Sequence, residues 1–298
     1  MHFRKIAVVG GGTMGQGIAQ VAASAGIDVV LVEVSEERAQ QVQRELSAKL
    51  DAQIAKWGLT TSDKRAILAR VHVTEDKAHF GHVDLAVEAV PERLAVKQAV
   101  FVDLERILGP DVVKITHTAT LSVSEISQVL QHPERAIGMH FLSPVHRVPV
   151  VEVVRGLATS DDTFGTVKQL IAVLGKTCVE VNEYPGYITT RGIVPMLNEA
   201  MHMVMEGVAS ARDVDAALKL GFGLEMGPLG MADRIGLDQV LLWMESLFHE
   251  LGEMKYRPCP LLRKMVLAGH LGIKSGKGFF VYSDPAGSGQ PSAAPGTP

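Results

Sequence analysis

The stretch KIAVVGGGTMG, residues 5–15, decides the fold of this chain. It is typical of a buried strand that runs into a glycine turn and then a helix, and its glycines fit the pattern G-x-G-x-x-G. Gly10 permits the tight turn, Gly12 lets the backbone approach a pyrophosphate, and Gly15 lets the helix pack closely on the strand. The stretch therefore predicts a dinucleotide-binding turn.

The residues around this turn complete the predicted cofactor site. A second strand-like run, 27–32, ends on Glu33, which lies 18 residues after Gly15. Glu33 is expected to accept hydrogen bonds from both ribose hydroxyls and to repel a 2′-phosphate, so the sequence favours NAD over NADP. Thr13 and Met14 open the helix, where free N–H groups and the helix dipole favour the phosphate charge.

The composition argues against several function classes. The chain has 298 residues, 47% of them apolar and 21% charged, and a formal net charge of −4. It has no basic stripe with interleaved aromatic residues, so nucleic acid is not an expected partner. No apolar run approaches the roughly 20 residues of a membrane helix, and the first strand begins too early for a signal peptide.

Cys178 and Cys259 lack metal or CxxC spacing, so we expect free thiols and no metal. By elimination, we expect a cytoplasmic location.

Up to residue 184, short apolar runs alternate with helical patterns. Such alternation predicts an α/β, Rossmann-like, doubly wound and mostly parallel sheet with helices on both faces. The expected strands are 5–9, 27–33, 71–74, 84–90, 112–116, 136–140, 148–154 and 178–181, and the expected helices include 36–57, 94–108, 122–130 and 161–174.

After residue 184 the pattern becomes helical, with amphipathic stretches at 194–206, 211–220, 239–251 and 261–267. We therefore expect an NAD-binding domain at 1–184 and a helical substrate and dimerisation domain at 185–283. A tail of Pro, Gly, Ala and Ser at 284–298 is expected to be disordered. The Met- and Leu-rich helices are accounted for by a helical core, but their wide apolar faces favour a homodimer.

His140 is the candidate acid–base group. Carbonyl reduction and alcohol oxidation both move a proton on oxygen, and histidine is its usual carrier. His140 follows the apolar run 136–139, on the side where open α/β sheets place ligands. Glu152 lies inside Val-Val-Glu-Val-Val, where an acid is costly unless it is paired. On a neighbouring strand, Glu152 would hold the imidazole tautomer and stabilise its protonated form; the alternative is a histidine that only packs in the core.

Taken together, these residues resemble the 3-hydroxyacyl-CoA dehydrogenase family, of the short monofunctional kind that includes 3-hydroxybutyryl-CoA dehydrogenases. The resemblance implies a Rossmann-like domain, a helical dimerisation domain, and NAD-dependent oxidation of an L-3-hydroxyacyl-CoA or the reverse. It also implies that His140 is the catalytic base and Glu152 its partner. The matching segments are GGGTMGQGIAQ (10–20), EAVPE (88–92), GMHF (138–141), VEVVRG (151–156), MLNEA (196–200), GPL (227–229) and KSGKGF (274–279).

The resemblance also assigns cofactor contacts. It matches Glu92, Lys97 and Lys274 to positions that contact NAD. Ser143, which replaces an asparagine of the family pattern, is expected on the cofactor side as well.

The substrate side departs from the family pattern. Ala119 stands where relatives carry a serine, and Thr190 stands where they carry an asparagine. His117 is a further departure: it would donate to a substrate carboxylate or only pack against the nicotinamide pocket. The hydroxyls of Thr118 and Thr120 are candidates to rebuild the lost contacts.

Three functions remain open from the sequence. The main prediction is an NAD-dependent 3-hydroxyacyl-CoA dehydrogenase with an acyl-CoA substrate. The second is the same hydride chemistry on a non-CoA 3-hydroxy acid or a pathway-specific substrate. The third is a non-catalytic, dinucleotide-binding dimer.

Overall fold

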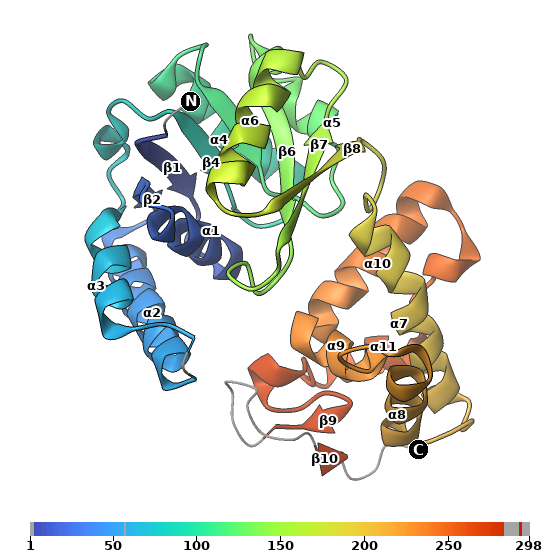
Figure 1. The fold of residues 1–298 in the computed structure, drawn as a ribbon. Helices are drawn as coiled ribbons and strands as arrows, with labels where there is room; N and C mark the ends of the chain where they lie inside the picture. The colour runs from blue at the N-terminus through green and yellow to red at the C-terminus, as the bar shows by residue number, and fades with distance from the viewer. Residues whose placement is uncertain (1–2, 57, 283–291, 294–298) are drawn as a thin grey trace. The chain divides into compact units, whose positions relative to one another are not determined.

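The computed structural model describes residues 3–56, 58–282 and 292–293, and the chain divides into two compact units. The first unit, Met1–Tyr187, is a sheet with helices packed on it, and the second, Ile188–Pro298, is mainly helical (Figure 1). This is the predicted fold class, which is thereby confirmed. The tail expected at 284–298 lies outside the described residues, apart from the two-residue strand β10 (Ser292–Ala293).

An eight-stranded sheet forms the centre of the first unit, in the order β3-β2-β1-β4-β5-β6-β7-β8. Neighbouring strands are parallel except β6 and β7, which are antiparallel. The strands are β1 (Lys5–Val9), β2 (Asp28–Val32), β3 (Val71–Thr74), β4 (Leu85–Glu88), β5 (Val113–Thr116), β6 (Ala136–Phe141), β7 (Val150–Arg155) and β8 (Thr177–Asn182).

Helices cover both faces of this sheet because successive strand residues point to opposite sides. Val8 of β1 belongs to the buried cluster that contains residues of α1, α2 and α6, whereas Val9 packs in a cluster with Leu104 of α4. The helices are α1 (Thr13–Ser24), α2 (Glu36–Ala55), α3 (Thr61–Arg70), α4 (Leu94–Leu108), α5 (Val123–Ser127) and α6 (Asp161–Val173), with short 3-10 turns η1 (Lys77–Phe80) and η2 (Pro133–Arg135).

The strand order reverses between β1 and β4, and this reversal positions the candidate site. From β1 the chain proceeds to β2 and β3 on one side and then returns to β4 on the other. Open α/β sheets bind ligands beyond the carboxyl ends of the strands at such a switch point. The glycine turn follows β1 and the segment from Ala89 follows β4, so both segments meet there.

The second unit packs its helices around a buried core that includes Leu197, Met201 and Met244. Asp233 anchors its C-terminal segment, because the carboxylate accepts bonds from the amides of Phe279 and Phe280 at 3.0 Å each. The elements are α7 (Thr189–Met205), α8 (Ala211–Phe222), α9 (Pro228–Ile235), α10 (Leu237–Leu251), η3 (Met254–Tyr256), α11 (Pro260–Leu267), η4 (Ile273–Ser275) and β9 (Phe280–Val281), which pairs with β10.

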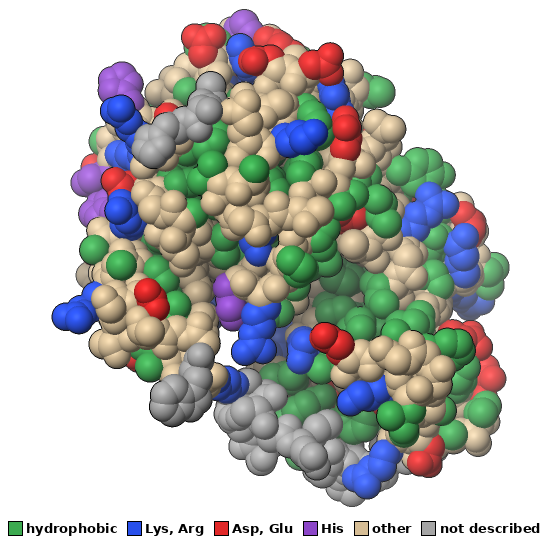
Figure 2. All heavy atoms as spheres, viewed as in Figure 1, with side chains coloured by type: hydrophobic (Ala, Val, Ile, Leu, Met, Phe, Trp, Pro, Cys, Tyr) green, Lys and Arg blue, Asp and Glu red, His purple; other side chains and the backbone are tan. Residues whose placement is uncertain are grey.

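The surface of the first unit carries charges of both signs. Figure 2 shows Lys and Arg side chains scattered among acidic and uncharged side chains on the face in view. Among the helices of the described residues, none has the length and apolar character that a membrane span requires.

Candidate active site

The glycine turn after β1 has the geometry of a dinucleotide cradle. Gly10 has φ +98°, and a Cβ there would lie 2.8 Å from the carbonyl oxygen of Ala89. A Cβ at Gly15 would lie only 1.9 Å from the carbonyl oxygen of Gly10. Gly12 differs, because a Cβ there would meet no protein atom within 4 Å. The space beside Gly12 is therefore open, as the approach of a pyrophosphate requires.

The start of α1 is suited to an anion. Gly12 is its N-cap residue and no side chain caps the helix. Gly12 and Thr13 are exposed, and Met14 is half-buried. An exposed helix N-terminus without a side-chain cap leaves N–H groups and the positive end of the dipole for a phosphate. These residues thus fit the pyrophosphate of NAD.

Glu33 lies beside the same turn, directly after β2. Its Oε1 accepts a hydrogen bond from the amide of Gly11 at 2.7 Å, and Oε2 accepts one from the amide of Val34 at 3.1 Å. The Arg38 guanidinium Nε is 3.6 Å from Oε1. The carboxylate is therefore fixed next to the cradle, where the ribose contact is predicted.

His140 and Glu152 form a buried pair. They are direct partners in the antiparallel register of β6 and β7, so their side chains emerge on the same face. The Nδ1 atom of His140 is 2.7 Å from Oε2 of Glu152, and each side chain is only 2% exposed. A carboxylate accepts only from Nδ1–H, which leaves Nε2 with its lone pair. The pair therefore has the arrangement of an oriented general base.

His117, the residue after β5, lies next to His140. The ring centroids of the two histidines are 6.0 Å apart, and Nε2 of His117 is 3.3 Å from the carbonyl oxygen of Phe141. Burial and the neighbouring His140 lower the pKa of His117 to about 3, so its ring is neutral at pH 7. Since a carbonyl only accepts, this contact uses the Nε2–H of His117 and leaves a lone pair at Nδ1. Of the two roles considered for His117, packing fits this contact better than donation to a carboxylate.

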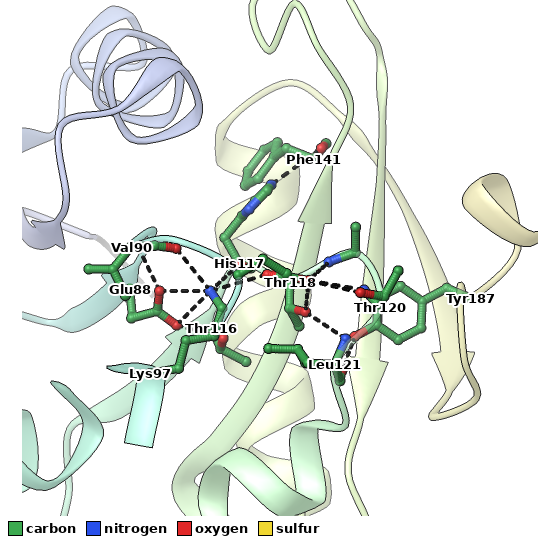
Figure 3. Close-up of polar contacts among 12 residues, drawn as sticks. Glu88, Val90, Lys97, Thr116, His117, Thr118, Thr120, Leu121, Phe141 and Tyr187 are labelled. Carbon is green, nitrogen blue, oxygen red and sulfur yellow. Dashed lines mark hydrogen bonds and ion pairs between the residues drawn. The ribbon is translucent and has the colours of Figure 1, made fainter. Parts of the chain in front are cut away.

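Lys97 on α4 is buried among protein oxygens. Its side chain is 0% exposed, and its ammonium lies 2.8 and 3.1 Å from the two carboxylate oxygens of Glu88. It also donates to the carbonyl oxygen of His117 at 2.7 Å (Figure 3). The three protons of a lysine are thus taken by protein oxygens. The contact of Lys97 with NAD stays a prediction.

Glu92 holds the loop that follows β5. Its Oε1 accepts from the hydroxyl of Thr118 at 2.5 Å and from the amides of Ala119 and Thr120 at 2.9 and 3.1 Å. Burial raises the pKa of Glu92, but the Lys97 ammonium 3.5 Å away and these donors outweigh burial and keep the pKa below its usual value. Glu92 is therefore an anion at neutral pH.

The hydroxyls of Thr118 and Thr120, in the loop after β5, are already bonded within the protein. Thr118 donates to Glu92 and accepts from the amide of Leu121 at 3.0 Å, and Thr120 Oγ1 lies 3.4 Å from Glu92. Ala119 is buried and has no hydroxyl. The predicted rebuilding of lost donors by Thr118 and Thr120 is therefore not supported by their contacts.

Three further predicted site residues lie outside the loop after β5. Ser143 is exposed in the segment between β6 and β7. Thr190 is in the second unit, and within the described part of the chain its buried Oγ1 has no hydrogen-bond partner. Lys274 is also in the second unit, where its ammonium pairs with Asp238 at 2.5 Å and its side chain is 49% exposed. Buried polar groups without a partner are rare, which marks Thr190 as a candidate ligand contact.

Sequence reasoning missed Tyr187, the last residue of the first unit. Its buried ring lies 5.8 Å from the His140 ring, and its hydroxyl donates to the carbonyl oxygen of Leu121 at 2.9 Å. The one available signal was a tyrosine directly after the Pro185-Gly186 turn.

In the described residues, no group of three or more His, Cys, Asp or Glu side chains could hold a metal ion.

A nucleotide cradle at the switch point of a parallel sheet, with a buried histidine–carboxylate pair on neighbouring strands, defines a dinucleotide-dependent dehydrogenase. Family models agree with this class. Residues 5–184 match the 3-hydroxyacyl-CoA dehydrogenase NAD binding domain, and residues 186–282 match the 3-hydroxyacyl-CoA dehydrogenase C-terminal domain. The chain belongs to the 3-hydroxyacyl-CoA dehydrogenase family, and it is an NAD-dependent dehydrogenase acting on a CH–OH group.

Individual relatives match over almost the whole chain. The probable 3-hydroxybutyryl-CoA dehydrogenase of Bacillus subtilis is 43% identical over 284 residues, which cover 95% of this chain and 99% of that protein. The crystal structure of (S)-3-hydroxybutyryl-CoA dehydrogenase from Ralstonia eutropha is 39% identical, with a TM-score of 0.85, and the match covers 95% of this chain and 100% of that one. The 3-hydroxyadipyl-CoA dehydrogenase of Escherichia coli is 35% identical over 94% of this chain and 59% of that protein.

Proposed function

We propose that this protein oxidises short-chain L-3-hydroxyacyl-CoA thioesters to 3-oxoacyl-CoA, or catalyses the reverse reduction, with His140 as the acid–base residue. The observation that carries the proposal is the buried contact of 2.7 Å between His140 and Glu152. The short acyl chain is inferred from the relatives in Bacillus subtilis and Ralstonia eutropha, whose names give 3-hydroxybutyryl-CoA.

The chemistry of the pair follows from its orientation. Because Nδ1 of His140 faces Glu152, Nε2 is the atom that accepts the proton of the C3 hydroxyl during oxidation. Glu152 holds the required tautomer and stabilises the imidazolium that results. NAD, when bound, accepts the hydride that leaves C3. In the reduction, Nε2–H of His140 returns its proton to the C3 oxygen. The unpartnered Oγ1 of Thr190 supports a contact of this side chain with the substrate.

The cofactor would be held by the turn that Gly10, Gly12 and Gly15 form, by the first turn of α1 at Thr13 and Met14, and by Glu33. Glu92, Lys97, Ser143 and Lys274 remain predicted contacts. Glu92 also binds the amides of Ala119 and Thr120 in the loop after β5.

Glu33→Ala is expected to weaken the preference for NADH over NADPH. The variant removes a carboxylate that would repel a 2′-phosphate and bond the ribose hydroxyls, and each effect is worth about 1–3 kcal/mol. The ratio of kcat/KM for NADH to that for NADPH should therefore fall by about 10-fold or more. Glu36→Ala, three residues further along at the start of α2, is the matched control and should leave the ratio unchanged. An unchanged ratio of kcat/KM for NADH to that for NADPH in Glu33→Ala would contradict the predicted contact between Glu33 and the ribose.

A substrate panel tests the proposed function. Acetoacetyl-CoA, a 3-oxoadipyl-CoA and free acetoacetate are each supplied with NADH, and the loss of NADH absorbance is followed. We expect the thioesters to exceed the free acid in kcat/KM by about 100-fold or more, because binding energy from the remote CoA moiety is used in the transition state. A free acid turned over as well as the thioesters would favour the second function predicted from the sequence. No turnover of any thioester would refute the proposal.

We also propose a homodimer that forms through the helical unit in the cytoplasm. Support comes from large apolar side chains that are exposed on this unit, with Leu220 80%, Phe222 76% and Leu267 88% exposed. Apolar side chains are also visible on the surface of this unit in Figure 2. Isolated monomers rarely expose extended apolar patches. Sedimentation equilibrium should give twice the chain mass of 32.0 kDa, and a monomer would contradict the proposal.

A further inference from the structure

Arg38, in the first turn of α2, places a cation beside the predicted ribose site. Its Nε atom lies 3.6 Å from Oε1 of Glu33, the carboxylate expected to bind the ribose hydroxyls, and its side chain is 30% exposed. Guanidinium groups bind phosphate through charge-assisted, often bidentate hydrogen bonds. An arginine near this ribose accommodates the 2′-phosphate in NADP-binding folds. The chain therefore carries, next to an acid that favours NAD, the type of side chain that an NADP site uses.

The Arg38 guanidinium is already occupied by protein oxygens. Besides its contact with Glu33, its Nη1 donates to Oε1 of Glu45 at 2.9 Å, and its Nη2 donates to the carbonyl oxygen of Gly11 at 3.4 Å. Glu45 is the closer of the two carboxylates and lies 7 residues further along α2. A 2′-phosphate would have to compete with two negative charges for the same N–H donors.

Glu45 is held in place for this contact from two helices. Its Oε2 accepts from Nε2 of Gln16 at 2.7 Å, and its Oε1 also accepts from Gln41 at 2.9 Å. Gln16 is a buried residue of α1, which lies beside α2 (Figure 1), and its Nε2 also donates to the carbonyl oxygen of Gly11 at 2.7 Å. Burial raises the pKa of Glu45, but the hydrogen bonds from Arg38 and Gln16 outweigh burial and keep the pKa below its usual value. Glu45 is therefore an anion at neutral pH.

We propose that Arg38 and Glu45, together with Glu33, determine the preference of this dehydrogenase for NAD. Glu33 repels the 2′-phosphate, and Glu45 neutralises the cation that would otherwise bind it. This role of Glu45 requires no contact between its side chain and the dinucleotide. The proposal rests on the ribose position given under the proposed function, but it is measured by nucleotide binding and does not depend on the acyl substrate.

The two carboxylates are expected to act in steps. Loss of Glu33 removes the repulsion and the contact of 3.6 Å but leaves the closer ion pair with Glu45. Loss of the Glu45 charge frees Nη1 but leaves Glu33 beside the ribose. Each single change should therefore weaken the preference for NAD in part, and the combined change should release the guanidinium for a 2′-phosphate.

Glu45→Gln in the full-length protein is the first test, by fluorescence titration with NADPH and with NADH. Glutamine keeps the size of the side chain and one acceptor oxygen but removes the charge. The Kd for NADPH should fall by about 3–10-fold, because a partly exposed guanidinium exchanges a carboxylate partner for a phosphate. The Kd for NADH should change by no more than about threefold, since NADH has no 2′-phosphate for Arg38 to bind.

The second test measures the 2′-phosphate contact directly in Glu33→Ala/Glu45→Gln. Calorimetric titrations with 2′,5′-ADP and with 5′-AMP differ only in that phosphate. Relative to the unaltered protein, the ratio of the two Kd values should shift toward 2′,5′-ADP by about 10–100-fold, the scale of a hydrogen bond to a charged group. Arg38→Met, added to this double variant, should reverse the shift by about 10-fold or more.

Arg44→Met provides the comparison for a change in net charge alone. Arg44 is an exposed arginine on the same helix, and its removal from the double variant should alter the ratio of Kd values by no more than about threefold. If Glu33→Ala/Glu45→Gln does not fold, Glu33→Gln replaces Glu33→Ala, because an amide oxygen can still accept from the amide of Gly11.

Two results would overturn the proposal. If Arg38→Met changes the Kd values of 2′,5′-ADP and 5′-AMP equally, Arg38 supports the cradle and does not contact the 2′-phosphate. If Glu45→Gln leaves the Kd for NADPH unchanged, Glu45 does not contribute to the cofactor preference. A protein that turns over no thioester but shows the expected shift toward 2′,5′-ADP would refute the proposed function and still support the role of Arg38.

Discussion

Replacement of His140 by alanine is expected to lower kcat by about 10²–10⁴-fold, the range for loss of a general acid–base group. The reason is geometric: Nε2 is the only imidazole nitrogen of His140 not directed at Glu152. Binding of NADH should be retained, because the nucleotide cradle lies on β1 and α1. Steady-state rates with acetoacetyl-CoA and fluorescence titration with NADH provide the two measurements.

The partner and a matched control sharpen this test. Glu152→Gln keeps the size of the side chain but can present an amide N–H to Nδ1, which favours the wrong tautomer, so a loss on the order of 10²-fold or more is expected. His132 and Glu134 form another histidine–glutamate pair at 3.1 Å, but their side chains are 44% and 46% exposed. His132→Ala should leave kcat unchanged. Full activity in His140→Ala would point to the non-catalytic function or to another base.

The pairing of His140 with Glu152 was predictable from the sequence because strands have a period of two. An acid at the centre of an apolar strand needs a partner, and a histidine at the end of the preceding strand is within reach once the two strands pair. The glycine turn was also predictable, since each of its glycines is required by the local backbone geometry or by the approach of the ligand. Helices α3 and α9 were not among the predicted helices; α3 buries Ile67 alone of its ten residues and so leaves little periodic signal.

The protein contacts of Lys97 were not predictable from its position in the motif. The direction of its side chain depends on Glu88, which is completely buried at the end of β4. Burial of that carboxylate demands a cation, and Lys97 on the first turn of α4 supplies it at 2.8 Å. Likewise, the hydroxyls of Thr118 and Thr120 counted as available donors in the sequence, but their bonds to Glu92 depend on how the loop folds.

Gly12→Ala is expected to abolish most cofactor affinity while it leaves the fold intact. No protein atom lies within 4 Å of the added methyl group, and Gly12 has φ −67°, which alanine adopts readily. The methyl would instead occupy space into which the pyrophosphate must approach. Overpacking of this kind costs about 1–3 kcal/mol, so the Kd for NADH should rise by about 10–100-fold. Thermal unfolding without cofactor should give an unchanged Tm.

Gly15→Ala is the matched contrast for this prediction. Its methyl would lie 1.9 Å from the carbonyl oxygen of Gly10, so the backbone itself must move. Tm should therefore fall together with NADH affinity, since overpacking against the backbone destabilises the folded state. A loss of affinity without a loss of Tm in Gly12→Ala, and a loss of both in Gly15→Ala, would separate the glycine that the ligand requires from the glycine that the fold requires. Equal Kd values for Gly12→Ala and the unaltered protein would instead place the pyrophosphate away from this turn.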